Sequence, residues 1–215
     1  GHAEAITALK ASGADVNALD TDGNMPVHIA VENSHIEAIR ALKSAGANVN
    51  ALNRSGKTLV FIVIENRELW SDLSFHSFGS HSASRKGAQL VATLKGLGAN
   101  IDIRNQDDKT PLFIAAENGQ LEAITALLDA GANASLTSRH GTALEAARRG
   151  SSRSSREIGI VRLLETHLQQ YPDGVKPVRI EKEAVSLHAN FSRPEHKSPS
   201  TLTQFQQSTA LARKS

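Results

Sequence analysis

Apolar residues recur along this chain at the spacing of one helical face. Ile, Ile and Leu stand three residues apart within residues 36–42, and Leu, Ile and Leu do so within residues 121–128. This periodicity predicts amphipathic helices in both segments. Pro26 and Pro111 precede these segments and predict the start of another helix before each of them. Proline suits the first position of a helix because the N–H that it lacks would have no hydrogen-bond partner there. The pattern therefore predicts pairs of short helices in an all-α fold.

Two short phrases repeat with the same interval. A Gly-Ala phrase begins at positions 13, 46, 98 and 131, so its intervals are 33, 52 and 33 residues. A second phrase begins at positions 25, 58, 110 and 142, with intervals of 33, 52 and 32 residues. Two independent phrases with one period indicate a repeat protein, in which stacked units bury apolar faces that one helix pair cannot bury alone.

The segments around the Gly-Ala phrase predict how each unit ends. Glycine follows the helical stretch, where a residue with positive φ ends a helix at little cost. The residues after it are rich in Asn and Asp, as in residues 20–23, 53–56 and 105–108, and this composition is typical of turns.

These phrases resemble the ankyrin repeat, a β-turn finger followed by a helix opened by Thr-Pro-Leu-His, a second helix and a closing Gly-Ala-Asp/Asn-x-Asn. The resemblance covers residues 1–168 and implies a helix-turn-helix solenoid of about 4.5 repeats with short fingers. His28 keeps the family's histidine, and we interpret it as structural. Phe61 and Phe113 replace it in other units, and Asp108 stands where the family's turn has glycine.

The resemblance also implies a function and a site. The family binds partner proteins through a concave surface of finger tips and inner helices. Carried over by position, the finger candidates are Thr21, Asp22, Asn24, Arg54, Ser55, Lys57, Gln106, Asp107 and Lys109. The inner helices supply three Glu-Asn pairs: Glu32, Asn33, Glu65, Asn66, Glu117 and Asn118. We expect the three carboxylates to stack as an acidic ladder that favours a partner with a basic surface, the alternative being that they only solvate the surface.

Residues 67–85 form a 19-residue insertion between the helices of the third unit. It contains Trp70, the one tryptophan of the chain, which we include among the candidate partner-binding residues. One interpretation is a protrusion that contacts a partner, and the other is a loop that folds back over apolar surface. Asp72 and His76 have a metal-ligand spacing, but two ligands without a third do not predict a metal site.

The last unit and the tail differ from the repeat. Arg148, Arg149 and Ser151 form a basophilic kinase pattern, with a short insertion at residues 151–155. Ser151 is therefore a candidate phosphorylation site, and the alternative is a solvated basic turn. Residues 169–215 are polar and basic, so we predict a disordered tail with a short helix near residues 181–187.

Composition narrows the classes of function. The absence of cysteine excludes disulfides and thiolate metal sites and favours the cytoplasm, or the cytosol of a host if the protein is an effector. Lys and Arg number 12 against 16 Asp and Glu in residues 1–147, and 12 against 6 in residues 148–215. The basic part is short and mixed in sign, so we do not expect a nucleic-acid partner. The apolar runs are too short to span a membrane.

We found no pattern for catalysis. The chain has no Gly-rich phosphate loop, no nucleophile elbow and no zinc spacing, so we expect neither an enzyme nor a cofactor. The prediction is a monomeric module for protein–protein interaction. The alternative is the recognition part of a larger enzyme or secreted host-directed effector, because the chain begins in the middle of a repeat and we interpret it as a fragment.

Overall fold

The computed structural model describes residues 2–70, 82–150 and 155–176. The described helices are α1 Ala3–Ala11, α2 Pro26–Glu32, α3 Ile36–Ser44, α4 Leu59–Glu65, the 3-10 helix η1 Arg67–Leu69, α5 Ser82–Gly96, α6 Pro111–Glu117, α7 Leu121–Asp129, α8 Ala143–Gly150 and α9 Ser155–Gln170. The described part contains no β-strand, only an isolated bridge between Ser138 and Gly141. The all-α repeat fold is confirmed. Ser151, residues 71–81 of the insertion and the tail from residue 177 lie outside the described residues.

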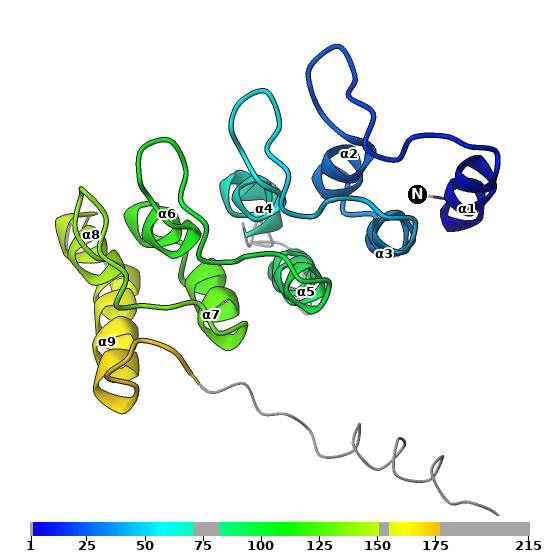
Figure 1. The fold of residues 1–215 in the computed structure, drawn as a ribbon. Coiled ribbons are helices and arrows are strands. Elements are labelled where there is room, and N and C mark those ends of the chain that lie inside the picture. Colours follow the sequence, from blue (N-terminus) through cyan, green and yellow to red (C-terminus); the bar gives the residue numbers. More distant parts are fainter. Residues whose placement is uncertain (1, 71–81, 151–154, 177–215) are drawn as a thin grey trace, which may run out of the picture. The chain divides into compact units, whose positions relative to one another are not determined.

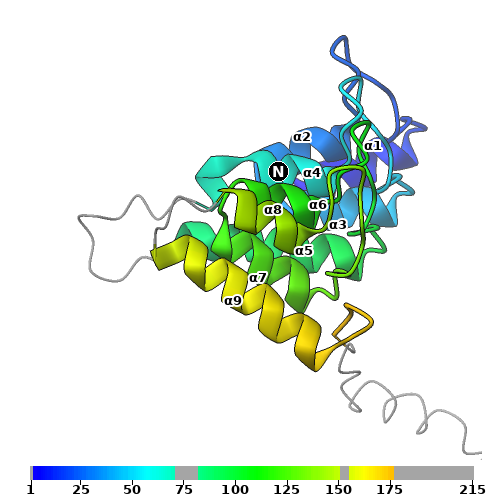
Figure 2. The same ribbon diagram turned by 90° about the vertical axis from the view of Figure 1, so that its left-hand side faces the viewer.

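The helices form two rows within residues 1–178 (Figure 1). Helices α2, α4, α6 and α8 pack against one another in an inner row, while α5, α7 and α9 pack in sequence in an outer row with α1 and α3. Each inner helix also packs against its outer partner, as α2 does against α3 and α6 against α7. The loops between the pairs project beyond the inner row, which the second view also shows (Figure 2).

The inner helices begin as their residues predict. Pro26 and Pro111 occupy the first turn of α2 and α6. The Thr110 hydroxyl accepts a hydrogen bond from the backbone N–H of Phe113 at 3.2 Å, so it caps α6. The outer helices α1, α3, α5 and α7 end at glycines with positive φ, such as Gly46 at 99°, a conformation that glycine adopts without steric cost.

The core lies between the two rows and is built mainly from aliphatic residues. All residues from Leu59 to Ile64 in α4 are buried, so this helix is apolar on every side. Such a pattern is typical of a helix enclosed by neighbours on both sides. Phe61 and Phe113 are the largest fully buried side chains and fill the position that His28 takes in α2.

Polar side chains tie the stems of the repeats together. Asn17 donates from Nδ2 to the carbonyl of Gly46 at 3.3 Å and accepts the N–H of Asn48 at 2.9 Å. Asn50 repeats both bonds one unit later, donating to the carbonyl of Gly98 at 3.1 Å. These two units thus each use one amide side chain as both donor and acceptor to hold the next unit.

Asp102 takes the place of this asparagine in the next unit. Its carboxylate accepts the N–H of Asn133 at 2.9 Å, but an ionised carboxylate has no proton to donate to the following carbonyl. Burial raises the pKa of Asp102 above its ordinary value, and the Asn133 N–H and the Lys95 charge only partly oppose this. Half of the stem contact is therefore missing at this unit.

The packed unit continues past the boundary that we expected at residue 168. Helix α9 runs to Gln170, and the chain then turns back so that the carbonyl of Gly174 accepts the N–H of Ala134 at 2.8 Å. Lys176 forms an ion pair with Asp129 at 2.8 Å. Gly174 has a φ of 76°, and a Cβ there would lie 2.5 Å from the backbone nitrogen of Ser135. These polar contacts, rather than apolar packing, hold the return, so the spacing of apolar residues did not predict it.

Candidate functional site

Each projecting loop is a finger built around one short polar side chain. We define finger 1 as residues 20–24, finger 2 as 53–57, finger 3 as 105–109 and finger 4 as 138–141. In each of the first three fingers, one side-chain oxygen accepts the backbone N–H groups of the residues two and four positions later, at 2.8–3.0 Å. The accepting residues are Asp20, Asn53 and Asn105. These local bonds fix the turns that the Asn/Asp-rich segments predicted.

Arginines connect neighbouring fingers through backbone carbonyls. Arg54 of finger 2 donates to the carbonyl of Thr21 at 3.0 Å, and Arg139 of finger 4 donates to the carbonyl of Gln106 at 3.0 Å. Both bonds link residues 33 apart, so they recur with the repeat. Because a carbonyl carries no net charge, these contacts position the guanidinium groups without neutralising them.

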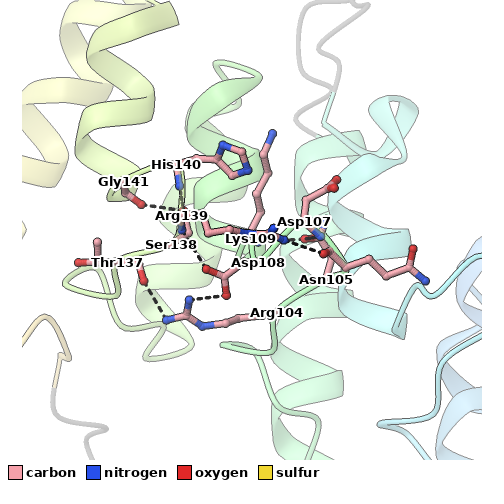
Figure 3. A network of polar contacts seen from close by, with 11 residues as sticks. Arg104, Asn105, Asp107, Asp108, Lys109, Thr137, Ser138, Arg139, His140 and Gly141 are labelled. Carbon is pink, nitrogen blue, oxygen red and sulfur yellow. Dashed lines mark hydrogen bonds and ion pairs between the residues drawn. The ribbon is translucent and has the colours of Figure 1, made fainter.

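Asp108 performs the task of the glycine that it replaces. It adopts a φ of 64°, in the left-handed region that glycine takes at the equivalent Gly56. One carboxylate oxygen pairs with Arg104 at 2.7 Å and the other accepts the N–H of Arg139 at 2.9 Å (Figure 3). The Arg104 hydrogen bond, followed by the Arg139 N–H, lowers the pKa of Asp108. These bonds compensate for the unfavourable φ and join fingers 3 and 4.

His28 has the structural role that we expected. Its ring is fully buried, with Nδ1 accepting the N–H of Met25 at 3.0 Å and Nε2 donating to the carbonyl of Ala51 at 3.3 Å. This arrangement requires a neutral ring with its proton on Nε2. Burial lowers the pKa of His28, although hydrogen bonding to Ala51 opposes the shift.

A groove opens between the fingers and the inner helices, and we call it the finger groove. It is lined by Asp22, Asn24, Glu32, Asn53, Ser55, Lys57, Ile62, Glu65 and Asn66. The structure therefore brings together seven of the predicted contact residues. A second depression beside it contains Asn33 with Asn66, and a third contains Glu117 and Asn118 with Gly150. Thr21, Arg54, Gln106 and Asp107 are exposed on the fingers, and Lys109 is half-buried.

The expected acidic ladder is interrupted, and this prediction was wrong for two of its three rungs. Lys57 forms an ion pair with Glu65 at 2.5 Å, and Lys109 forms one with Glu117 at 2.8 Å. The cause is a lysine at the last position of fingers 2 and 3, within reach of the end of the inner helix. Exposed pairs of this kind contribute about 0–1 kcal/mol to stability, so their main effect is to cancel charge.

Trp70 does not belong to the exposed surface, which corrects its place among the partner-binding candidates. Its side chain is buried, and Nε1 donates to the carbonyl of Val63 at 2.8 Å. The indole fills the space beside Gly87, where a Cβ would lie 2.8 Å from the ring. The first residues of the insertion thus fold back onto the array, and α5 begins at Ser82 rather than after residue 85.

Sequence reasoning missed two groups of surface residues. Arg149 in α8 occupies the position of the ladder glutamates, a register visible in the 32-residue interval from Glu117. Leu19 and Leu52, one repeat apart beside fingers 1 and 2, are 61% and 55% exposed. Nothing in the apolar pattern distinguished them from core leucines.

The described residues contain no group of three or more side chains suited to hold a metal ion. None of the helices described is long and apolar enough to cross a membrane. A family model for ankyrin repeats, three copies, matches residues 1–71 and 80–169. No curated protein matches the chain.

Proposed function

Because the chain belongs to the ankyrin-repeat family, we propose that it binds a partner protein through the face formed by its four fingers and the ends of its inner helices. We call this surface the finger face. Ankyrin repeats generally act in protein–protein interaction and are typically not catalytic. The observation that supports this surface is the finger groove, in which polar and charged side chains from two adjacent repeats converge.

The finger face has properties that suit recognition. Its fingers are held by side-chain and backbone hydrogen bonds within and between repeats, so its shape is organised before a partner arrives. Preorganisation reduces the conformational entropy lost on binding. The charged groups on this face provide selectivity, since complementary charge favours the right partner and repels others. Glu32 and Asp22 are carboxylates without an ion pair among the described residues, and they favour a basic group on the partner.

Site-specific photocrosslinking tests the proposal. A photoreactive residue replaces Ser55, which lines the finger groove, or Ser44, which is exposed at the end of α3 in the outer row. We expect Ser55 variants to crosslink a discrete protein in cells and Ser44 variants to give no such product. Binding of the purified pair, measured by calorimetry, must then weaken on changing Glu32→Lys. Identical products from both positions, or none from Ser55, would contradict binding through the finger face.

A further inference from the structure

The inner helices carry a row of charged residues in equivalent positions near their ends. The row consists of Glu32, Glu65, Glu117 and Arg149, which belong to α2, α4, α6 and α8. We call it the helix-end row. Its sign changes from negative to positive at the last unit. Because the inner helices pack in sequence, these four side chains follow one another along the finger face.

The two middle members of the row are neutralised within their own repeats. Glu65 pairs with Lys57 at 2.5 Å, and Glu117 accepts two hydrogen bonds from Lys109 at 2.8 and 3.0 Å. Each pair joins the last residue of a finger to the end of the next helix. A partner passing over the middle of the finger face therefore meets little net charge.

The first member of the row keeps its charge. Finger 1 ends in Asn24, which cannot provide the ammonium group that Lys57 and Lys109 provide in fingers 2 and 3. Glu32 is exposed and forms no ion pair within the described part of the chain. Asp22 lines the same groove, also without an ion pair there. Arg54 lies nearby and keeps its charge, so two carboxylates and one guanidinium group give the α2 end of the finger face a net negative charge.

The last member of the row has the opposite charge and also keeps it. Arg149 is exposed, and its guanidinium group donates to the backbone carbonyl of His140 and lies over the ring of Phe113, 5.8 Å from its centre. Neither contact provides a negative charge. Arg139 nearby is likewise bound to a carbonyl. The α8 end of the finger face is therefore basic, with its guanidinium groups held in place.

We propose that the finger face binds a partner segment with charges of opposite sign at its two ends, a basic group at Glu32 and Asp22 and an acidic group at Arg149. This inference rests on the proposed function and adds the partner's chemistry and polarity. Three helix spacings of about 8–10 Å separate Glu32 from Arg149 by roughly 24–30 Å. An extended chain covers this distance in about 7–9 residues at ~3.3 Å per residue. The neutral middle admits uncharged side chains.

In the test, the full chain is immobilised as the target, and peptides that bind it are selected from a displayed library of random sequences. Three versions serve as targets: the parent, the swapped variant Glu32→Arg with Arg149→Glu, and the control Glu37→Arg with Arg40→Glu, which inverts an exposed ion pair of the outer helix α3 away from the finger face. We expect parent-selected peptides to carry a basic and an acidic residue about 7–9 positions apart in a fixed order. The swapped variant should select the opposite order, and the control should select the parental order.

Fluorescence anisotropy of one selected peptide gives the magnitude. Glu32→Arg alone should weaken its binding about 3- to 10-fold, because an exposed attraction becomes a repulsion. The same charge order on the parent and the swapped variant would overturn the inference while leaving the proposed function intact, as would selected peptides without a charge pattern. No selection on any version would overturn both. Circular dichroism of each variant confirms that a lost interaction is not lost folding.

Discussion

The stem contact made by Asp102 leads to a sharp prediction about stability. Asn17 and Asn50 each donate to a carbonyl of the following unit as well as accepting an N–H, whereas ionised Asp102 only accepts. Asp102→Asn should supply the missing donor to the carbonyl of Gly131. It should also remove the unfavourable burial of a carboxylate, the main cause of the raised pKa.

One restored hydrogen bond is worth about 0.5–1.5 kcal/mol. For a chain of this size, 1 kcal/mol corresponds to a Tm increase of about 2–4 °C. Loss of the attraction between Asp102 and Lys95 acts in the opposite direction, but Lys95 is exposed and its field is screened by salt. We therefore expect a net gain of ~1 kcal/mol for Asp102→Asn at neutral pH, measured by urea unfolding followed by circular dichroism.

The reciprocal variant and the pH dependence identify the cause. Asn50→Asp removes the donor to the carbonyl of Gly98, so it should lower stability by a similar amount at neutral pH. A carboxyl group whose pKa is raised by folding contributes stability that is full below its unfolded pKa and is lost as the pH rises through its folded pKa. The advantage of Asp102→Asn over the parent should thus shrink in acid. If the stability gain of Asp102→Asn were equal at neutral and acidic pH, or absent at neutral pH, the reasoning would be refuted.

Three further predictions follow from close packing and burial. Gly174→Ala should destabilise the chain by about 1–3 kcal/mol in urea unfolding, because Gly174 has a positive φ and a Cβ there would meet the backbone. Gly159→Ala in α9 is the control: a Cβ there has open space, so this change should be neutral or stabilising. Gly87→Ala should displace the indole of Trp70, so the fluorescence of this one tryptophan should shift to the red, and an unchanged spectrum would contradict the packing. Burial lowers the pKa of His28, so the free energy of unfolding should fall as the pH drops below about 6.5, and a flat profile between neutral and mildly acidic pH would show that the ring is not buried.

The sequence was sufficient to predict the repeat, because the repeat has its own period. The helix pairs, the turns between them and the start of α2 and α6 at Pro26 and Pro111 are confirmed. These features depend on local preferences and on burial against a neighbouring unit of the same kind. The sequence period of about 33 residues therefore predicts both the structure of one unit and its packing on the next.

Features that join different positions of the repeat were harder to predict. The ion pair between Lys57 and Glu65 requires a finger residue to reach a helix end, and the burial of Trp70 depends on the missing side chain of Gly87 across the insertion. The return at Gly174 is held by a backbone bond to Ala134 and by an ion pair between Lys176 and Asp129, contacts that join residues far apart in the sequence. Arg149 has the register of the three glutamates but the opposite charge, so similarity between units did not identify it.

The hydrogen bonds between fingers are distributed unevenly along the finger face. Fingers 1 and 2 are joined by Arg54 and by a bond from Asn53 to Asn24 at 3.2 Å, and fingers 3 and 4 are joined through Arg139 and Asp108. Over the residues that the structure describes, no hydrogen bond connects finger 2 to finger 3. Fingers 2 and 3 instead meet through packing, because the side chain of Gln106 lies against Gly56. Van der Waals contact therefore sets the spacing of these two fingers, and any side chain at position 56 would disturb it.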